Sequence, residues 1–231
     1  MIVSELPAEQ RALIENLQKD ISSLYQSFSN AYMNDWEVQA KEPELENAPP
    51  PVLQVAKGCN TDGVASVARY YPVESDYYDW PLQQRAFRVT APSKEHMCKS
   101  VVMENRAYSP DTGLGEDVYP RFICVMTQYT SPVNTERLMK HIRDLSGRAI
   151  GKKYYNYRVA QSEKSFELTG YEKGGVCPMG TTQGVPIVLA ESITKLDPPV
   201  FIMGAGHIDW KLGLPVVDFV RATKCFVFDL E

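Results

Sequence analysis

Two glycine-rich segments near the end of the chain carry the residues best suited to chemistry. The first, 170–180, reads GYEKGGVCPMG, and the second, 201–207, reads FIMGAGH. Glycine lets the backbone approach a ligand closely, and the proline at position 178 fixes the turn that presents it. A loop of this kind can direct main-chain N–H groups at a reacting carbonyl without any catalytic side chain.

Side-chain chemistry has weaker support in the sequence. Cys177 is a candidate nucleophile, but no nearby residue would activate its thiol. The chain has no G-x-S-x-G motif, and its three histidines are isolated from one another. Its five cysteines are scattered and form no C-x-x-C pair, so we expect reduced thiols, no metal site and no cofactor.

Composition places the chain among ordinary globular proteins. Of its 231 residues, 44% are hydrophobic and 23% are charged. A chain of this length can bury a hydrophobic core without the help of disulfides. We expect no membrane span, because no apolar run approaches about 18 residues, and a polar N-terminus favours the cytoplasm. The net charge of −5 argues against a broadly basic nucleic-acid binder. A net negative charge is compatible with a local basic patch. Residues 148–158 mix cationic with aromatic side chains, and this segment either contacts RNA or forms a solvated turn.

The chain divides by pattern into three parts. Residues 1–40 form an N-terminal extension in which 5–33 read as an amphipathic helix with apolar residues at heptad spacing. That stripe packs on the protein itself, or it serves a homodimer or a docking partner. Residues 41–52 are rich in Pro and Glu, typical of a linker. Residues 53–231 alternate strand and helix patterns, which predicts a mixed α/β (α+β) domain.

Within that domain the individual elements are predicted as follows. Val, Ile, Phe and Tyr favour strands at 64–73, 100–104, 121–129, 186–190, 199–203 and 225–229. Helices are expected at 81–89, 134–145, 158–168 and 215–223, with a turn-rich loop at 109–115. The helix at 134–145 has the clearest signal, since Leu138, Ile142 and Leu145 share one face and Asn134 or Thr135 can cap it.

The ordered motifs after the linker resemble the YbaK/ProX family, the aminoacyl-tRNA deacylases related to the editing domain of prolyl-tRNA synthetase. The resemblance rests on Met97-Cys98-Lys99-Ser100-Val101-Val102, on Leu168-Thr169-Gly170-Tyr171, and on Gly174-Gly175-Val176-Cys177-Pro178-Met179-Gly180. The 204–206 turn and the 214–218 segment also match in order. The resemblance implies a YbaK-like fold, in which helices surround a mixed, barrel-like sheet. The long loop 108–119 and the N-terminal helix depart from the short bacterial members.

The resemblance also implies roles for particular residues. Lys99 would be the essential lysine, whose ammonium binds the tRNA end and stabilises the developing oxyanion. Gly174, Gly175 and Val176 would be the catalytic residues of the loop, and the N–H group of Gly175, Val176 or Cys177 would bind the aminoacyl carbonyl. The ribose 2′-hydroxyl and a bound water would assist hydrolysis. The substrate-binding residues implied around them are Cys177, Pro178, Gly204, Ala205, Gly206 and His207.

Two functional hypotheses follow, with different partners. The first is a trans-editing aminoacyl-tRNA deacylase acting on mischarged tRNA, in the first place tRNA(Pro) carrying Ala, Cys or another small amino acid. The second is a non-catalytic module that binds tRNA and docks through its N-terminal helix to prolyl-tRNA synthetase or a multi-synthetase assembly. A third takes the chain as the amino-terminal piece of a longer synthetase. Retention of both Lys99 and the Gly-Gly-x-x-Pro loop favours the enzyme.

Overall fold

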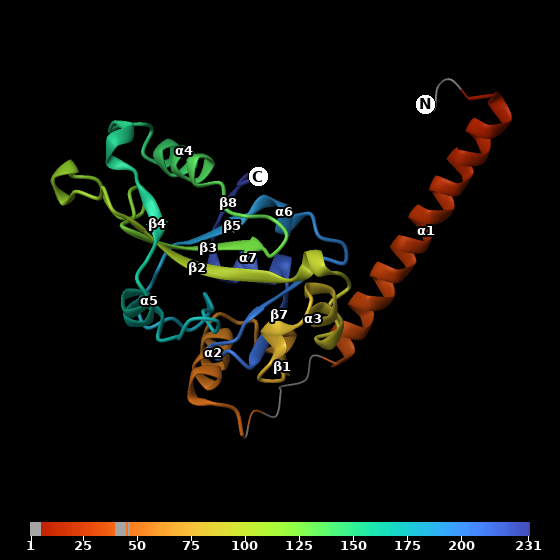
Figure 1. Cartoon of the computed structure of the whole chain (residues 1–231), viewed down its shortest axis with the longest axis horizontal. Helices are drawn as coiled ribbons and strands as arrows, with labels where there is room; N and C mark the ends of the chain where they lie inside the picture. The colour runs from red at the N-terminus through yellow and green to blue at the C-terminus, as the bar shows by residue number, and fades with distance from the viewer. Residues whose placement is uncertain (1–5, 40–44, 46) are drawn as a thin grey trace. The chain divides into compact units, whose positions relative to one another are not determined.

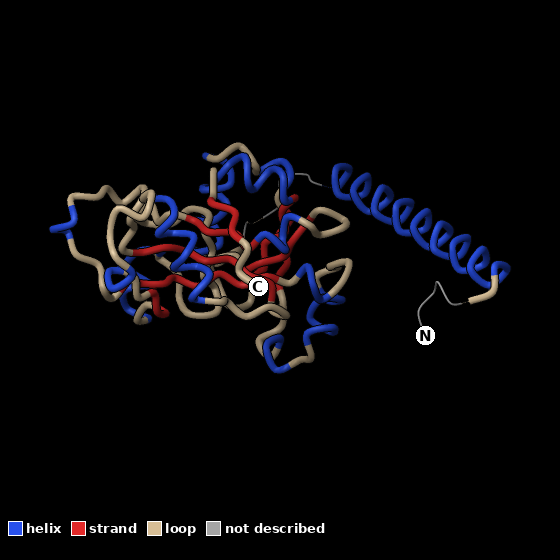
Figure 2. The backbone as a smooth tube through the Cα atoms, turned by 90° about the horizontal axis from the view of Figure 1, so that it is seen from above, coloured by secondary structure: helices blue, strands red, loops and turns tan. Residues whose placement is uncertain are grey.

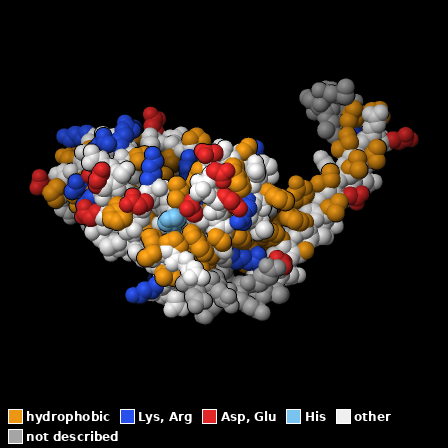
Figure 3. Space-filling view, turned by 60° about the horizontal axis from the view of Figure 1, so that its bottom comes forward, with side chains coloured by type: hydrophobic (Ala, Val, Ile, Leu, Met, Phe, Trp, Pro, Cys, Tyr) orange, Lys and Arg blue, Asp and Glu red, His pale blue; other side chains and the backbone are white. Residues whose placement is uncertain are grey.

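The computed structural model describes residues 6–39, 45 and 47–231, and the chain divides into two compact units, Met1–Gln39 and Ala40–Glu231. The first unit is one helix, α1 (Ala8–Gln39). Large apolar side chains along it are exposed, among them Leu17 (51%), Ile21 (53%), Leu24 (71%) and Phe28 (48%). Figure 3 shows hydrophobic side chains along this helix. These side chains belong to the apolar stripe predicted at 5–33, in the part of it that the structure describes.

The second unit is built on two sheets (Figures 1 and 2). A five-stranded sheet has the order β4-β2-β3-β5-β8, in which β2 pairs antiparallel with β3 and β4, while β3, β5 and β8 run parallel. A three-stranded antiparallel sheet has the order β1-β7-β6. A parallel bridge from Met97 to Ile202 joins the two sheets just before the start of β2. The strands are β1 (Arg69–Pro72), β2 (Cys98–Asn105), β3 (Phe122–Gln128), β4 (Tyr157–Val159), β5 (Ile187–Ala190), β6 (Val200–Gly204), β7 (Trp210–Pro215) and β8 (Phe226–Phe228).

Helices surround these sheets, so the domain has the mixed α+β architecture expected from the sequence. The α-helices are α2 (Pro50–Thr61), α3 (Leu82–Arg88), α4 (Thr135–Leu145), α5 (Ser162–Thr169), α6 (Glu191–Thr194) and α7 (Val216–Thr223). Short 3-10 turns are η2 (Ala65–Val67), η3 (Tyr77–Asp79), η4 (Lys94–His96), η5 (Pro110–Thr112) and η6 (Lys152–Tyr154). None of the helices in the described ranges has the length and apolar character needed to cross a bilayer.

Helix α4 shows why the clearest sequence signal was reliable. The Asn134 side chain accepts hydrogen bonds from the backbone N–H groups of Glu136 and Arg137 and so caps the first turn. Leu138 and Ile142, one turn apart, are fully buried against the core that includes Val125 of β3. Cap and apolar stripe agree with each other, which makes this helix predictable from local sequence alone.

Three differences between the predicted and the observed elements have local reasons. Pro50 to Val52, assigned to the linker, form the first turn of α2, where proline is tolerated because its missing N–H has no intrahelical acceptor. The helix expected at 158–168 begins only at Ser162, because Tyr157 to Val159 pair with β2 instead. Strand β7 was missed: its Gly213 and Pro215 are weak strand formers, and pairing with both β1 and β6 overrides that weakness.

Candidate active site

A cavity of about 410 Å³ opens between β2 and the glycine-rich loop that follows α5. We call it the β2 cavity. Its walls come from β2, the end of β3, the region joining β4 to α5, the 173–176 loop, η3 and the end of β6. The lining residues are Tyr78, Cys98, Lys99, Ser100, Val101, Val102, Tyr129, Val159, Ala160, Ser162, Ser165, Lys173, Gly174, Val176 and Gly204.

Lys99 lies on β2 and lines this cavity, as the sequence predicts for a functional lysine. Its Nζ atom is 5.8 Å from the centre of the Tyr129 ring, within reach of a cation–π interaction. The guanidinium of Arg85 lies 5.0 Å from the same ring. The Lys99 side chain is half-buried, and no carboxylate among the described residues forms an ion pair with it. Its charge is therefore available to an anionic or developing negative group.

The loop after α5 is held in a defined shape by two hydrogen bonds. Gly174 has a φ of +91°, a left-handed conformation that glycine adopts at little cost, and its carbonyl accepts a hydrogen bond from the Tyr78 hydroxyl at 3.0 Å. The Gly175 N–H donates to the Glu172 carbonyl at 3.0 Å. Gly175 is thus not a free donor, contrary to one of the options raised by the sequence. Within the described part of the chain, the N–H groups of Val176 and Cys177 have no hydrogen-bond acceptor.

The second glycine-rich segment packs directly against this loop. The Gly206 N–H donates to the Gly175 carbonyl at 2.8 Å. A Cβ built on Gly175 would lie 2.5 Å from the Gly206 carbonyl oxygen, and one built on Gly204 would lie 2.9 Å from that of Val176. Two backbones approach so closely here that side chains are excluded. The glycines at 174, 175, 204 and 206 therefore belong to one interlocked wall.

Other residues expected around the site lie outside the lining of the β2 cavity. Cys177 and Ala205 are fully buried, and Pro178 and Gly206 are also buried. Burial raises the pKa of the Cys177 thiol well above its ordinary value, so the thiol stays protonated and is a poor nucleophile. The His207 side chain is half-exposed, and its Nδ1 accepts a hydrogen bond from the Asp209 N–H at 3.2 Å.

Sequence reasoning missed several residues that line the β2 cavity. Tyr78 comes from η3, about 100 positions before the loop it contacts, and only the tertiary fold brings the two together. Tyr129 follows β3, where pairing of Cys98 with Gln128 brings it close to Lys99. Lys173, directly before the two glycines, was a signal available in the sequence.

A buried lysine supports the cavity from behind. Lys211 is 3% exposed, and its Nζ lies 4.7 Å from the centre of the Tyr78 ring and 5.0 Å from that of Tyr77. The ammonium donates to the carbonyls of Ile208 and Trp210. Burial lowers the pKa of Lys211 to about 8 because the charged form loses its hydration. Through Tyr78, this lysine is packed one layer behind the Gly174 carbonyl.

The chemistry available in the β2 cavity follows from these groups. Two lysines and backbone N–H donors line it, whereas none of the described lining residues is a histidine, aspartate or glutamate. Among the described residues, no group of three or more His, Cys, Asp or Glu is arranged to hold a metal ion. The site can therefore bind an anionic substrate and stabilise an oxyanion, and its described lining offers no histidine or carboxylate as a general base.

Comparison with known proteins shows the family to which the chain belongs. A family model described as the aminoacyl-tRNA editing domain matches residues 86–222, more than half of the chain and both glycine-rich segments.

The chain belongs to the aminoacyl-tRNA editing domain family.

This editing domain is accordingly an aminoacyl-tRNA deacylase, an enzyme of translational editing, as the resemblance to the YbaK family implied. No curated protein matches the chain.

Solved structures share the fold of this editing domain at low sequence identity. One is described as a candidate trans-editing enzyme for prolyl-tRNA synthetase, with 18% identity, a TM-score of 0.62, and coverage of 80% of this chain and 99% of that one. A scaffold protein from computational epitope grafting has 16% identity and a TM-score of 0.59, covering 79% and 97%. The hypothetical protein APE2540 has 18% identity and a TM-score of 0.55, covering 77% and 98%. Identities this low establish the fold alone.

Proposed function

We propose that the β2 cavity hydrolyses the ester of mischarged tRNA in trans, with tRNA(Pro) carrying alanine, cysteine or another small amino acid as the first candidate. One observation carries this proposal: Lys99 and Val176 line the same cavity, which has no carboxylate among its described lining residues. The N–H of Val176 has no hydrogen-bond acceptor among the described residues. A synthetase pocket separates amino acids differing by one methylene only about 10- to 200-fold, so small residues reach the wrong tRNA in the cytoplasm. Interlocked glycine walls suit a second site that admits small side chains.

The roles we propose follow the geometry. Lys99 binds the phosphate or ribose of the terminal nucleotide and stabilises the oxyanion, while the N–H of Val176 donates to the aminoacyl carbonyl oxygen. Water attacks the carbonyl carbon, the substrate's 2′-hydroxyl assists the proton transfer, and the ester C–O bond breaks to leave a free 3′-hydroxyl and the amino acid. Gly174 and Gly175 fix the loop.

The residues around this centre position the loop and the substrate. Cys177 is buried behind Val176 and supports the loop by packing, and Gly204 faces the amino-acid side chain. Pro178, Ala205 and Gly206 hold the wall behind the substrate, and His207 lies at its edge.

A separate proposal concerns the N-terminal extension, residues 1–40, which precedes the editing domain. The exposed apolar stripe of α1 supports docking to prolyl-tRNA synthetase or a multi-synthetase assembly, with a homodimer through residues 5–33 as the other occupant. The acidic net charge supports a partner that supplies tRNA affinity. On the alternative hypothesis, docking and tRNA binding are the whole function and no ester is hydrolysed.

The test is single-turnover deacylation of Ala-, Cys- and Ser-tRNA(Pro), with Pro-tRNA(Pro) as control. The enzyme hypothesis expects rapid loss of one mischarged species with Pro-tRNA(Pro) intact. A double variant of the stripe, Leu17→Glu/Leu24→Glu, should leave that rate unchanged while abolishing association with a synthetase or a second copy. Folded protein that hydrolyses none of these species, yet associates through α1, would support the binding module instead.

A further inference from the structure

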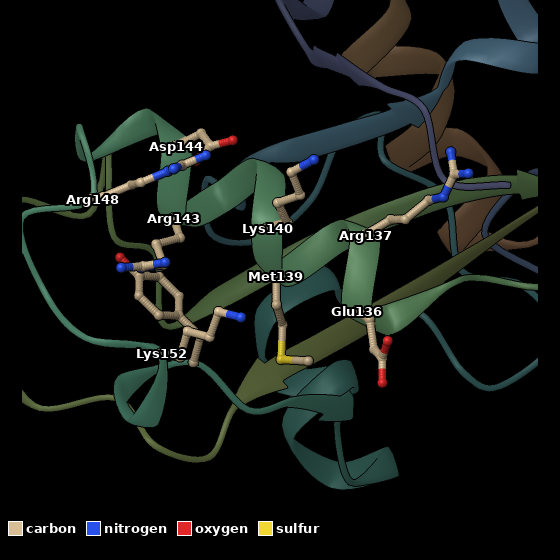
Figure 4. A pocket seen from close by; sticks show the side chains of 9 residues that line it. Glu136, Arg137, Met139, Lys140, Arg143, Asp144, Arg148 and Lys152 are labelled. Carbon is tan, nitrogen blue, oxygen red and sulfur yellow. The ribbon is translucent and has the colours of Figure 1, made fainter.

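A second, larger cavity of about 640 Å³ lies between α4 and the segment around η6. Figure 4 shows its lining side chains. Five cations line it, against two carboxylates, in a chain with a net charge of −5. The cations are Arg137, Lys140, Arg143, Arg148 and Lys152. We call this the α4 cavity. A concentration of positive charge on an acidic protein marks a place where an anion binds.

Part of that charge is neutralised within the protein, and part is not. Arg137 pairs with Asp229, and Arg148 pairs with Asp144 at 2.6 Å. By contrast, neither Lys140 nor Lys152 is paired with a carboxylate in the described ranges. The two lysines come from different elements, α4 and η6, so the fold rather than helical periodicity places them around one cavity.

Arg143 adds a donor whose position is already fixed. Its Nε atom donates to the Ile150 carbonyl at 3.1 Å, and its terminal nitrogens have no partner among the described residues. A guanidinium held in this way presents its remaining N–H groups in a planar fork that matches phosphate oxygens. Arg143 therefore distinguishes the α4 cavity from a surface that merely carries mobile lysines.

The α4 cavity is connected to the β2 cavity by a short stretch of chain. Tyr155 lines the α4 cavity and Val159 lines the β2 cavity, with β4 between them. Four residues of extended chain span about 13 Å at most. An RNA strand carries one phosphate per nucleotide, so a tRNA whose aminoacyl end enters the β2 cavity can extend phosphates to the α4 cavity.

We propose that the α4 cavity binds the phosphodiester backbone of the same tRNA whose aminoacyl end enters the β2 cavity. This inference rests on the proposed function. The α4 cavity would supply affinity for RNA, which the net charge of −5 does not favour. Phosphate contacts of this kind set affinity and orientation without reading sequence. The α4 cavity would therefore serve every tRNA equally and leave discrimination to the β2 cavity.

The experiment measures binding of uncharged tRNA by the full chain, so that it is independent of hydrolysis. The test variant is Lys140→Ala/Lys152→Ala, and the matched control is Lys195→Ala/Arg221→Ala, which removes two exposed cations from the end of α6 and from α7. We expect the Kd of the test variant to rise about tenfold near 50 mM salt. The slope of log Kd against log salt should fall by about 2, one for each phosphate that a lysine no longer neutralises.

Three results would overturn the proposal. One is an unchanged Kd in the test variant, and another is an equal rise in the control. The third is tight binding of inorganic phosphate or ATP that the test variant loses while its tRNA affinity stays intact, which would make this a small-anion site. If no mischarged tRNA is hydrolysed by wild-type protein but the test variant alone loses tRNA affinity, the proposed hydrolysis fails and the α4 cavity stands.

Discussion

The hydroxyl of Tyr78 donates a hydrogen bond to the carbonyl of Gly174 at 3.0 Å, which ties η3 to the loop that forms one wall of the β2 cavity. This bond fixes the peptide plane next to the Gly-Gly pair. The orientation of the loop therefore depends on a residue that shares no local sequence with it.

Tyr78→Phe should slow hydrolysis while leaving tRNA affinity unchanged. Loss of one hydrogen bond worth roughly 1 kcal/mol lets the loop amides tilt away from the oxyanion, and we expect a five- to tenfold fall in the single-turnover rate. Tyr77→Phe is the matched control, since its hydroxyl donates to the Arg85 carbonyl instead. Equal effects of the two substitutions would show a loss of general stability and not of loop orientation.

Gly204→Ala should damage the wall between the two glycine-rich segments. The added Cβ would lie 2.9 Å from the Val176 carbonyl oxygen, a backbone atom with little room to move. We expect a loss of about 1–3 kcal/mol in the free energy of unfolding, together with reduced hydrolysis. Gly184→Ala, where a Cβ meets nothing within 4 Å, should be neutral in urea unfolding and in activity. A stable and fully active Gly204→Ala protein would contradict this close packing.

Cys177→Ala should remain active. Burial raises the pKa of this thiol, so it does not act as a nucleophile, and its removal costs only packing, about 1–2 kcal/mol of stability. Hydrolysis by the variant, measured under conditions in which it stays folded, is expected within a few-fold of wild type. Complete loss of activity in folded Cys177→Ala protein would revive a covalent mechanism.

Lys211→Met should change how stability depends on pH. The folded pKa of about 8 is below the unfolded value of 10.5, so the unfolded chain binds the extra proton between these values. The charged lysine thus destabilises the fold fully below pH 8, and this penalty vanishes as the pH approaches 10.5.

The measurement is urea unfolding of both proteins from pH 7 to 10. The difference in unfolding free energy, Lys211→Met minus wild type, should fall by up to about 3 kcal/mol as the pH rises through this range. Titration of the shared cysteines and tyrosines cancels in the difference. A difference that does not change with pH would show that Lys211 is not held in a desolvated place.

Local patterns explain which parts of the fold were predictable. Helix α4 carries both a cap and an apolar stripe, strand β3 is rich in β-branched and aromatic residues, and β2 contains two adjacent valines, so these elements follow from sequence. Strand β7 was missed because Gly213 contributes no strand signal; only its two partner strands define it. Likewise α2 begins inside a run of prolines that reads as a linker.

The residues of the candidate site also differ in whether local sequence could predict them. Lys99 and the glycines could be predicted because short motifs carry them, and Lys99, Gly174, Val176 and Gly204 line one cavity in the structure. Tyr78 and Lys211 were missed because only tertiary packing gives them a role. His207 was expected near the site from its neighbours in sequence, but its side chain does not line the β2 cavity.

The most direct test of the central claim is the rate of single-turnover deacylation of mischarged tRNA(Pro) by Lys99→Ala, compared with wild type and Lys195→Ala. We expect the Lys99→Ala rate to fall about 100-fold or more, as for loss of a group that stabilises an oxyanion, with the melting temperature unchanged. Lys195→Ala, which removes an exposed lysine at the end of α6, should match wild type. A folded Lys99→Ala protein that hydrolyses the ester at the wild-type rate would contradict the assignment of the β2 cavity as the hydrolytic site.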